Sequence, residues 1–235
     1  KEVFGLQVSF SFLPEYWPYF RDGVIYTLML SFFTVVLAVL PAILLALMRL
    51  SKNKVLKFIA SAYIDIIRGT PMLVQLSIVY YGFFGAIHLP NYRIFGFIDV
   101  SMFVPGIIAL AVNSSAYVAE IIRAGILAVD KGQTEAARSL GMTQGQCMRM
   151  IVLPQAIKNI LPALGNEFVT LVKESSICST FGMTELMFGA NATRGATYQV
   201  MGPLLLAAGL YLCMTVPASK LLNYVERRMR RGDVR

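Results

Sequence analysis

The stretch VIYTLMLSFFTVVLAVLPAILLALM, residues 24–48, contains no charged side chain. As an α-helix it would measure about 37 Å, since each residue adds about 1.5 Å, and the hydrocarbon core of a bilayer is about 30 Å thick. Pro41 is tolerated inside such a helix as a kink. The stretch therefore predicts a transmembrane helix.

The composition of the whole chain agrees with a membrane protein. Hydrophobic residues make up 57% of the sequence and charged residues 14%, whereas soluble domains carry about a quarter charged residues. Further apolar segments, which we expect to span the bilayer, follow at residues 58–87, 101–122, 160–181 and 202–224. The sequence thus predicts an all-α polytopic membrane protein, a single domain over residues 1–235 with five transmembrane helices.

The basic residues indicate a topology rather than a nucleic-acid partner. Of the 21 Lys and Arg residues, 15 lie in residues 49–57, 123–158 and 220–235, and only four lie in the other connections and the N-terminus. Cytoplasmic loops of membrane proteins carry such an excess of positive charge. We therefore expect the N-terminus outside the cell, and residues 123–160 and the C-terminus in the cytoplasm.

Neither metal nor nucleotide chemistry is indicated. Cys147, Cys178 and Cys213 are scattered, and His88 is the single histidine, so no metal site or disulfide framework is expected. The phosphate-loop pattern G-x-x-x-x-G-K-[ST] is absent from the sequence, and we expect no cofactor to be bound by this chain.

The cytoplasmic segment at residues 130–158 has the signals of two short helices. Asp130-Lys131-Gly132-Gln133 and Thr143-Gln144-Gly145-Gln146 both fit a capping box. Gly141 follows the first helix as a C′ residue does, and Pro154 forces a boundary or a kink at the end of the second. The segment is predicted to form a rigid elbow joined at a glycine.

The same segment carries a family motif. Glu135-Ala136-Ala137, Gly141 and Ile151-Val152-Leu153-Pro154 together resemble the EAA loop, E-A-A-x3-G-x9-I-x-L-P, of the permeases of bacterial ABC importers. In that family the loop docks into a groove on a separate ATPase subunit. The resemblance implies a type I importer fold and assigns ATPase coupling to Glu135, Ala136, Ala137, Arg138, Gly141 and Pro154.

Three further motifs narrow the resemblance to importers of polar amino acids. Arg68-Gly69-Thr70-Pro71 with Gln75 resembles their R-G-T-P-x-x-x-Q signature. Ala116-Tyr117-x-x-Glu120-x-x-Arg123-x-Gly125-Ile126 is similar to their A-Y-x-x-E-x-x-R-x-G-I stretch. Leu164-Gly165-Asn166-Glu167 followed by Lys173-Glu174-Ser175-Ser176 matches their fourth span. The resemblance implies a dimer of ATPase subunits that binds ATP and Mg, a second permease, identical or paralogous, and an extracytoplasmic amino acid-binding protein.

Polar groups inside the predicted spans suggest a path for a zwitterion. A charge at membrane depth costs about 2.5–3.5 kcal/mol on insertion scales, so such residues face a cavity or a partner. An α-carboxylate is bound by a cation or by backbone N–H groups at a broken helix, and an α-ammonium by carboxylate or carbonyl oxygens. We expect the substrate path to be lined by Arg68, Gly69, Thr70, Pro71, Gln75, Asn113, Tyr117, Glu120, Lys173, Glu174, Ser175 and Ser176.

Simpler roles stay open for several of these residues. Asp65 and Arg68 are three positions apart and could pair along one helix face. Glu120, near a span end and beside Arg123, suits a structural role at the interface. Lys173 and Glu174 are adjacent, so a helix points them in different directions and at least one is expected to face a polar cavity.

Two other functions fit the sequence less well than the importer. An ion-coupled carrier or channel could use Asp65, Glu120 and Lys173 as a proton relay, but the chain has no inverted repeat and a carrier needs no EAA loop. A membrane-embedded enzyme lacks support, because the sequence offers neither a metal cluster nor a nucleophile–base pair.

Overall fold

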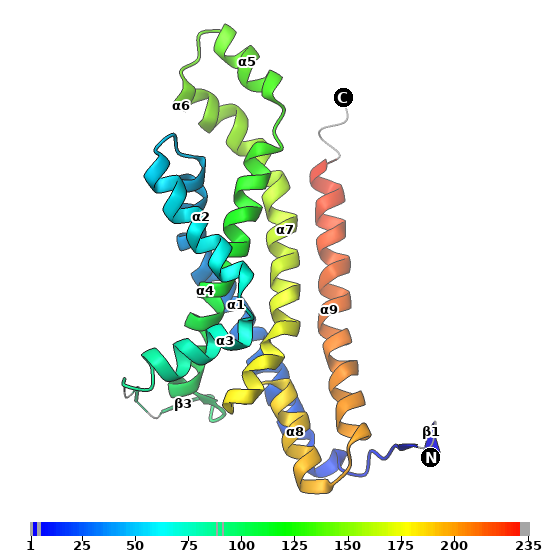
Figure 1. Cartoon of the computed structure of the whole chain (residues 1–235). Coiled ribbons are helices and arrows are strands. Elements are labelled where there is room, and N and C mark those ends of the chain that lie inside the picture. Colours follow the sequence, from blue (N-terminus) through cyan, green and yellow to red (C-terminus); the bar gives the residue numbers. More distant parts are fainter. Residues whose placement is uncertain (1, 4–5, 88, 91, 231–235) are drawn as a thin grey trace. The chain divides into compact units, whose positions relative to one another are not determined.

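The computed structural model describes residues 2–3, 6–87, 89–90 and 92–230. Lys1, His88, Arg231 and Arg235 lie outside the described residues. The helices are α1 (Leu13–Leu50), α2 (Lys54–Gly69), α3 (Met72–Ser77), α4 (Val100–Leu127), α5 (Lys131–Ser139), α6 (Gln144–Cys147), α7 (Leu153–Glu174), α8 (Leu186–Thr197) and α9 (Met201–Arg230) (Figure 1). The π-helical segments η1 (Ile78–Phe83) and η2 (Met148–Val152) and the 3-10 helix η3 (Ser175–Phe181) extend α3, α6 and α7.

Strands are confined to short antiparallel pairs in the described residues. β1 (Glu2–Val3) pairs with β2 (Leu6–Gln7), and β3 (Arg93–Ile94) pairs with β4 (Ile98–Asp99). The predicted all-α polytopic class is therefore confirmed.

Within the described residues, three helices are long and apolar enough to cross a membrane: Leu13–Leu50, Val100–Leu127 and Met201–Met229. They contain the predicted spans 24–48, 101–122 and 202–224. The predicted segment 58–87 consists of α2, α3 and η1, and the segment 160–181 consists of most of α7 followed by η3. Charged residues such as Lys158, Glu167 and Lys173 make α7 more polar than the other long helices.

The chain forms two compact units, and α1, α4, α7 and α9 each contribute residues to both. The first unit contains Lys1–Val35, Pro71–Ala111 and Phe168–Ala218, and the second contains Val36–Thr70, Val112–Glu167 and Ser219–Arg235. Each unit has its own core and is described by itself.

The first unit is held together by two apolar clusters. In one, Tyr26 of α1 packs edge-on against Phe103 of α4, with ring centroids 5.1 Å apart. In the other, Phe20 of α1, Leu186 of α8 and Ala207 of α9 are buried together. These contacts fix the outer turns of α1, α4, α8 and α9 in this unit.

Two glycines allow α1 and α8 to approach closely. A Cβ atom on Gly23 would lie 2.8 Å from Leu186 Cα, and one on Gly189 would lie 2.9 Å from the Tyr19 carbonyl oxygen. Real Cβ atoms essentially never come so close to backbone atoms. Both helices therefore need glycine at the crossing.

The second unit packs α1, α2 and α4 through small side chains. Ala42 and Ala46 of α1, Ile64 of α2 and Ala116 and Ala119 of α4 are fully buried in one cluster. The hydroxyl of Tyr63 donates to the Val112 carbonyl over 2.9 Å. Small residues at helix crossings are typical of membrane proteins, where backbones must approach closely because lipid provides no hydrophobic driving force.

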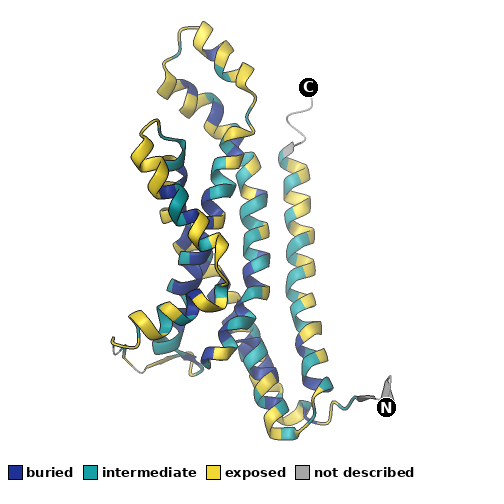
Figure 2. Cartoon of the chain, viewed as in Figure 1, coloured by how far each residue is buried: buried dark blue, intermediate teal, exposed yellow. Residues whose placement is uncertain are grey.

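Apolar side chains also cover the outside of the long helices. Leu40 and Leu44 of α1 and Leu212 and Leu221 of α9 are at least 60% exposed, and Figure 2 shows that exposed and half-exposed residues run along most of α9. Such surfaces are stable in hydrocarbon, where an apolar exterior costs nothing. The burial pattern agrees with a multi-pass membrane protein.

Candidate functional site

The elbow of the second unit begins with α5, which leaves the end of α4 through a short turn (Figure 1). The side chain of Asp130 caps α5 by accepting a 2.6 Å hydrogen bond from the Gly132 N–H. Asp130 is therefore confirmed as the N-cap of α5, but the predicted capping box with Gln133 is not formed among the described contacts.

The turn after α5 is built on Gly141. Its φ is +84°, and the Gly141 and Met142 N–H groups donate to the Arg138 and Ala137 carbonyls over 3.0 and 3.2 Å. This pair of bonds is a Schellman motif, in which the C′ residue adopts the left-handed conformation that glycine tolerates best. The side chain of Arg138 also donates to the Met142 carbonyl over 3.0 Å. The glycine joint predicted from the sequence is confirmed.

The second arm of the elbow begins with the predicted capping box. Thr143 Oγ1 accepts from the Gln146 N–H, and Gln146 Oε1 accepts from the Thr143 N–H over 2.8 Å. The arm widens into the π-helical η2 and returns to α-helix at Leu153, so that Pro154 stands at the predicted boundary. A π-helical turn is a known way to accommodate a local change in a helix.

The two arms enclose a small core that includes Ala137 and leave Glu135 and Ala136 of the EAA motif exposed. Ala137, Cys147 and Val152 are buried against one another, whereas Glu135, Ala136 and Arg138 are exposed. Leu140 is 85% exposed and Met150 is 64% exposed. These side chains are available for contact with a partner. Sequence reasoning missed Leu140 and Met150, although apolar residues in a polar connector were the available signal.

The R-G-T-P motif breaks the helix as predicted. α2 ends at Gly69, Thr70 is extended with φ −115° and ψ 145°, and α3 begins at Met72. A residue before proline is disfavoured in helical conformation, and Pro71 follows Thr70. The Thr70 hydroxyl donates to the Ile66 carbonyl over 2.9 Å.

Arg68 contacts Tyr117 of α4 rather than Asp65, which lies three positions earlier in α2. Its guanidinium carbon lies 5.3 Å from the centre of the Tyr117 ring, and no ion pair with Asp65 exists among the described residues. Both Asp65 and Arg68 are exposed on the surface of the single chain. The structure thus brings together Arg68 and Tyr117, two residues of the predicted path that are far apart in sequence.

Glu120 is held by two arginines. Its carboxylate forms ion pairs with Arg49 at the end of α1 and with Arg123 one turn along α4, the latter over 2.9 Å. All three side chains are largely shielded from solvent. This arrangement agrees with the structural role that the sequence left open for Glu120.

Polar contacts also join α4 to α7 in the second unit. The hydroxyl of Ser114, which is fully buried, donates to Glu167 Oε1 over 2.8 Å. The neighbouring Asn113 of the predicted path is 4% exposed. The Ser114–Glu167 bond satisfies a buried hydroxyl and ties α4 to α7.

The remaining path residues belong to the first unit. Gln75 of α3 is buried, Lys173 is exposed and Glu174 is half-buried. α7 ends at Glu174 and continues as the 3-10 helix η3 from Ser175, whose hydroxyl donates to the Val172 carbonyl over 2.9 Å. The predicted path residues 173–176 therefore lie where the chain changes from α-helix to 3-10 helix.

Glu185 was not singled out from the sequence. It is fully buried and caps α8, where its carboxylate accepts from the N–H groups of Met187 and Phe188 over 2.8 and 2.7 Å and from the Tyr211 hydroxyl over 2.8 Å. Burial raises the pKa of Glu185 to about 7, against the opposing effect of these hydrogen bonds. The available signal was an acidic residue that can cap a helix in the connection between the predicted spans 160–181 and 202–224.

Residues 35–231 match the family described as binding-protein-dependent transport system inner membrane component. The putative glutamine transport system permease protein GlnP of Rickettsia prowazekii is 42% identical over 221 residues, which cover 93% of this chain and 97% of that protein. The arginine transport system permease protein ArtQ of Bacillus subtilis is 38% identical and is covered over 94% of its length, with 92% of this chain.

Solved structures have the same fold. A crystal structure of an amino acid ABC transporter with histidines is 48% identical in sequence and has a TM-score of 0.85, with 95% of this chain and all of that chain covered. An inward-facing structure of the MetNI methionine ABC transporter is 22% identical with a TM-score of 0.67, covering 94% of this chain and 99% of that chain. At that identity the second likeness shows the fold alone.

Proposed function

The chain belongs to the family of binding-protein-dependent transport system inner membrane components, and from this membership we propose that it is the transmembrane subunit of an ABC importer that moves polar amino acids into the cytoplasm. The relatives are permeases for glutamine and arginine by name. The chain is not catalytic by itself, since the family uses a separate ATPase subunit. A binding protein outside the membrane delivers the substrate.

The observation that carries the proposal is the elbow of α5 and α6. Glu135, Ala136 and Arg138 are exposed on it, its joint is fixed by the Schellman motif at Gly141, and Leu140 and Met150 add exposed apolar side chains. A rigid projection of this kind can transmit the closing of two ATPase subunits to the spans. Alternating access then switches the spans between inward-facing and outward-facing states.

A second permease subunit is part of the proposal. Asp65, Arg68 and Lys173 fall in predicted spans and are exposed on the single chain, and a charge facing lipid is costly. An identical copy or a paralogue, enclosing a polar cavity, removes that cost. The assembly is therefore two permeases with two ATPase subunits.

The proposed topology has five spans, with the N-terminus outside and the C-terminus in the cytoplasm. It is supported by the distribution of basic residues, which gather around the elbow, at residues 49–57 and after Ser219. The substrate path runs along the predicted polar residues, which include Arg68, Tyr117 and Glu174. The exposure of Arg68, Tyr117 and Lys173 and the breaks in α2 and α7 support this role.

Uptake into proteoliposomes tests the proposal. The permease is purified with its partner ATPase subunit, reconstituted with ATP enclosed, and supplied outside with the binding protein and labelled glutamine or arginine. We expect accumulation that requires ATP, the ATPase and the binding protein. Accumulation by the chain alone, without ATP, would instead support an ion-coupled carrier and contradict the proposal.

A further inference from the structure

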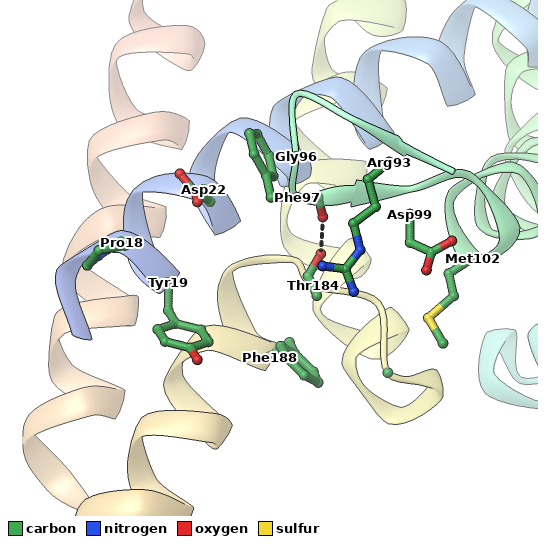
Figure 3. Close-up of a pocket in the computed structure, with 12 residues that line it drawn as sticks. Pro18, Tyr19, Asp22, Arg93, Gly96, Phe97, Asp99, Met102, Thr184 and Phe188 are labelled. Atoms are coloured by element: carbon green, nitrogen blue, oxygen red, sulfur yellow. Dashed lines mark hydrogen bonds between the residues drawn. The ribbon is translucent and has the colours of Figure 1, made fainter. Parts of the chain in front are cut away.

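The first unit contains a cavity of about 350 Å³ that the predicted path does not include. Its walls come from the first turns of α1, the β3–β4 hairpin, the start of α4 and the segment between η3 and α8 (Figure 3). Ligand sites in proteins are commonly about 300–1,000 Å³. The cavity is therefore large enough for a small metabolite and too small for a folded protein segment.

Charges of both signs lie in this cavity. Arg93 of β3 and Asp99 of β4 are cross-strand partners in the hairpin, so their side chains stand on one face of it. Figure 3 shows the Arg93 side chain running into the cavity toward Thr184. Asp22 of α1 lies on the opposite wall.

The two carboxylates are held by groups other than Arg93. Asp99 Oδ1 accepts from the N–H and the hydroxyl of Ser101 over 2.9 and 2.6 Å, and Asp22 Oδ1 accepts from Arg21 Nε over 2.8 Å. Each carboxylate has a second oxygen for a further partner. Among the described residues Arg93 forms no ion pair, so a cation and two anions share the cavity without neutralising one another directly.

The walls are fixed by packing. The Thr184 hydroxyl donates to the Phe97 carbonyl over 3.2 Å and ties the hairpin to the segment before α8. Ile98 of β4 is fully buried, and Gly189 allows α8 to approach Tyr19 of α1. The charged groups are thus presented by a preorganised frame, which lowers the entropy cost of binding.

We propose that this cavity is an extracytoplasmic subsite for a free α-amino acid. Arg93 receives the α-carboxylate through charge-assisted hydrogen bonds, Asp99 and Asp22 receive the α-ammonium, and the side chain lies against Phe188. The inference rests on the proposed function, which gives the cavity its extracytoplasmic location. The subsite holds the amino acid after the binding protein has released it.

Protection of a cysteine from a membrane-impermeant maleimide locates the ligand. The permease–ATPase complex in nanodiscs carries Cys213→Ser together with Tyr19→Cys at the cavity wall. Its matched control carries Ala196→Cys, which is exposed on α8 and outside the cavity. We expect glutamine or arginine, added without binding protein, to slow labelling of the Tyr19→Cys variant at least fivefold and to leave the Ala196→Cys variant unchanged.

Variants of Arg93 test the assigned chemistry. Arg93→Gln is expected to raise the amino acid concentration for half-protection at least tenfold, equivalent to about 1.4 kcal/mol, whereas Arg93→Lys keeps it within about threefold because the charge remains. An unchanged concentration in Arg93→Gln overturns the subsite. Equal protection of the Tyr19→Cys and Ala196→Cys variants also overturns it, because a global change then explains the result.

Two further outcomes separate the subsite from the proposed function. If binding protein without amino acid protects the Tyr19→Cys variant and free amino acids do not, the cavity is a protein contact and the subsite is wrong. If protection is absent while ATP-driven uptake is normal, the subsite fails and the importer stands. If the complex neither hydrolyses ATP nor takes up amino acid, the proposed function fails with it.

Discussion

The guanidinium of Arg68 lies over the ring of Tyr117, 5.3 Å from its centre, and joins the end of α2 to the middle of α4 in the second unit. A cation–π contact contributes about 0.5–1 kcal/mol when exposed and about 2 kcal/mol or more when desolvated. The contact lets α2 end in a break and still keep its last charged residue attached to a neighbouring helix.

The Tyr117 ring can be tested without removing the arginine. Tyr117→Phe keeps the π face and is expected to retain uptake. Tyr117→Leu loses the contact and is expected to lower the initial uptake rate about twofold to fivefold, as about 0.5–1 kcal/mol implies. Initial rates in proteoliposomes provide the measurement. Equal rates for the Phe and Leu variants would show that the contact has no role in transport.

Glu120 is expected to be needed for the stability of the second unit. Glu120→Gln leaves Arg49 and Arg123 close together without a carboxylate between them. Removing one partner of a fully buried ion pair costs about 3–5 kcal/mol, which is the upper limit here because these side chains keep 19–30% of their exposure. The midpoint of thermal unfolding should fall by several degrees. Glu15→Gln, at an exposed carboxylate, is the control, and an equal midpoint for both variants would contradict the ion-pair account.

Glu185 makes stability depend on pH. Because its pKa in the folded protein is raised from 4.5 to about 7, its contribution is fully present below about pH 4.5 and is lost as the pH rises toward 7, a change of about 3 kcal/mol. Above pH 7 the dependence levels off. Unfolding midpoints from pH 5 to 8 should therefore decline in the unmodified protein and change less in Glu185→Gln; an identical decline would assign the effect to other groups.

The crossing of α1 and α8 is expected to tolerate no side chain at Gly189. Gly189→Ala brings a Cβ to 2.9 Å from the Tyr19 carbonyl oxygen, and overpacking of this kind costs about 1–3 kcal/mol. Gly195→Ala on the same helix meets nothing within 4 Å and should stabilise slightly, because alanine favours helix over glycine. Opposite shifts of the unfolding midpoint are predicted, and a fall of equal size in both would contradict the packing argument.

Local signals in the sequence predicted the local features well. The break at Thr70 and Pro71, the capping box at Thr143 and the left-handed turn at Gly141 each follow from the chemistry of one or two adjacent residues. Such features are determined by backbone preferences, which the sequence carries directly.

Contacts between residues far apart in the sequence could not be predicted from such local signals. Arg68 is three residues from Asp65, which suggested an ion pair, but its contact is Tyr117 on another helix. Glu120 was expected beside Arg123, and the second arginine, Arg49, comes from α1. Glu185 gave no periodic signal because its burial depends on α8 and α9 folding around it. Tertiary packing, rather than spacing, decides these contacts.

Gly141 offers a test of how the elbow works. With φ at +84°, any L-residue is strained there, whereas Gly145 lies in α6, where a Cβ meets nothing within 4 Å. The left-handed conformation costs about 1–2 kcal/mol for a residue other than glycine. Gly141→Asp is therefore expected to distort the joint, and Gly145→Asp serves as the control with the same added charge.

The most direct test of the importer account is ATP hydrolysis by the permease–ATPase complex in nanodiscs, with binding protein loaded with glutamine or arginine. The account predicts that loaded binding protein stimulates hydrolysis several-fold, that Gly141→Asp abolishes the stimulation while the ATPase still hydrolyses ATP, and that Gly145→Asp retains it. Hydrolysis that is indifferent to binding protein in the unmodified complex, or stimulation that survives Gly141→Asp unchanged, would contradict the claim that this elbow couples ATP to transport.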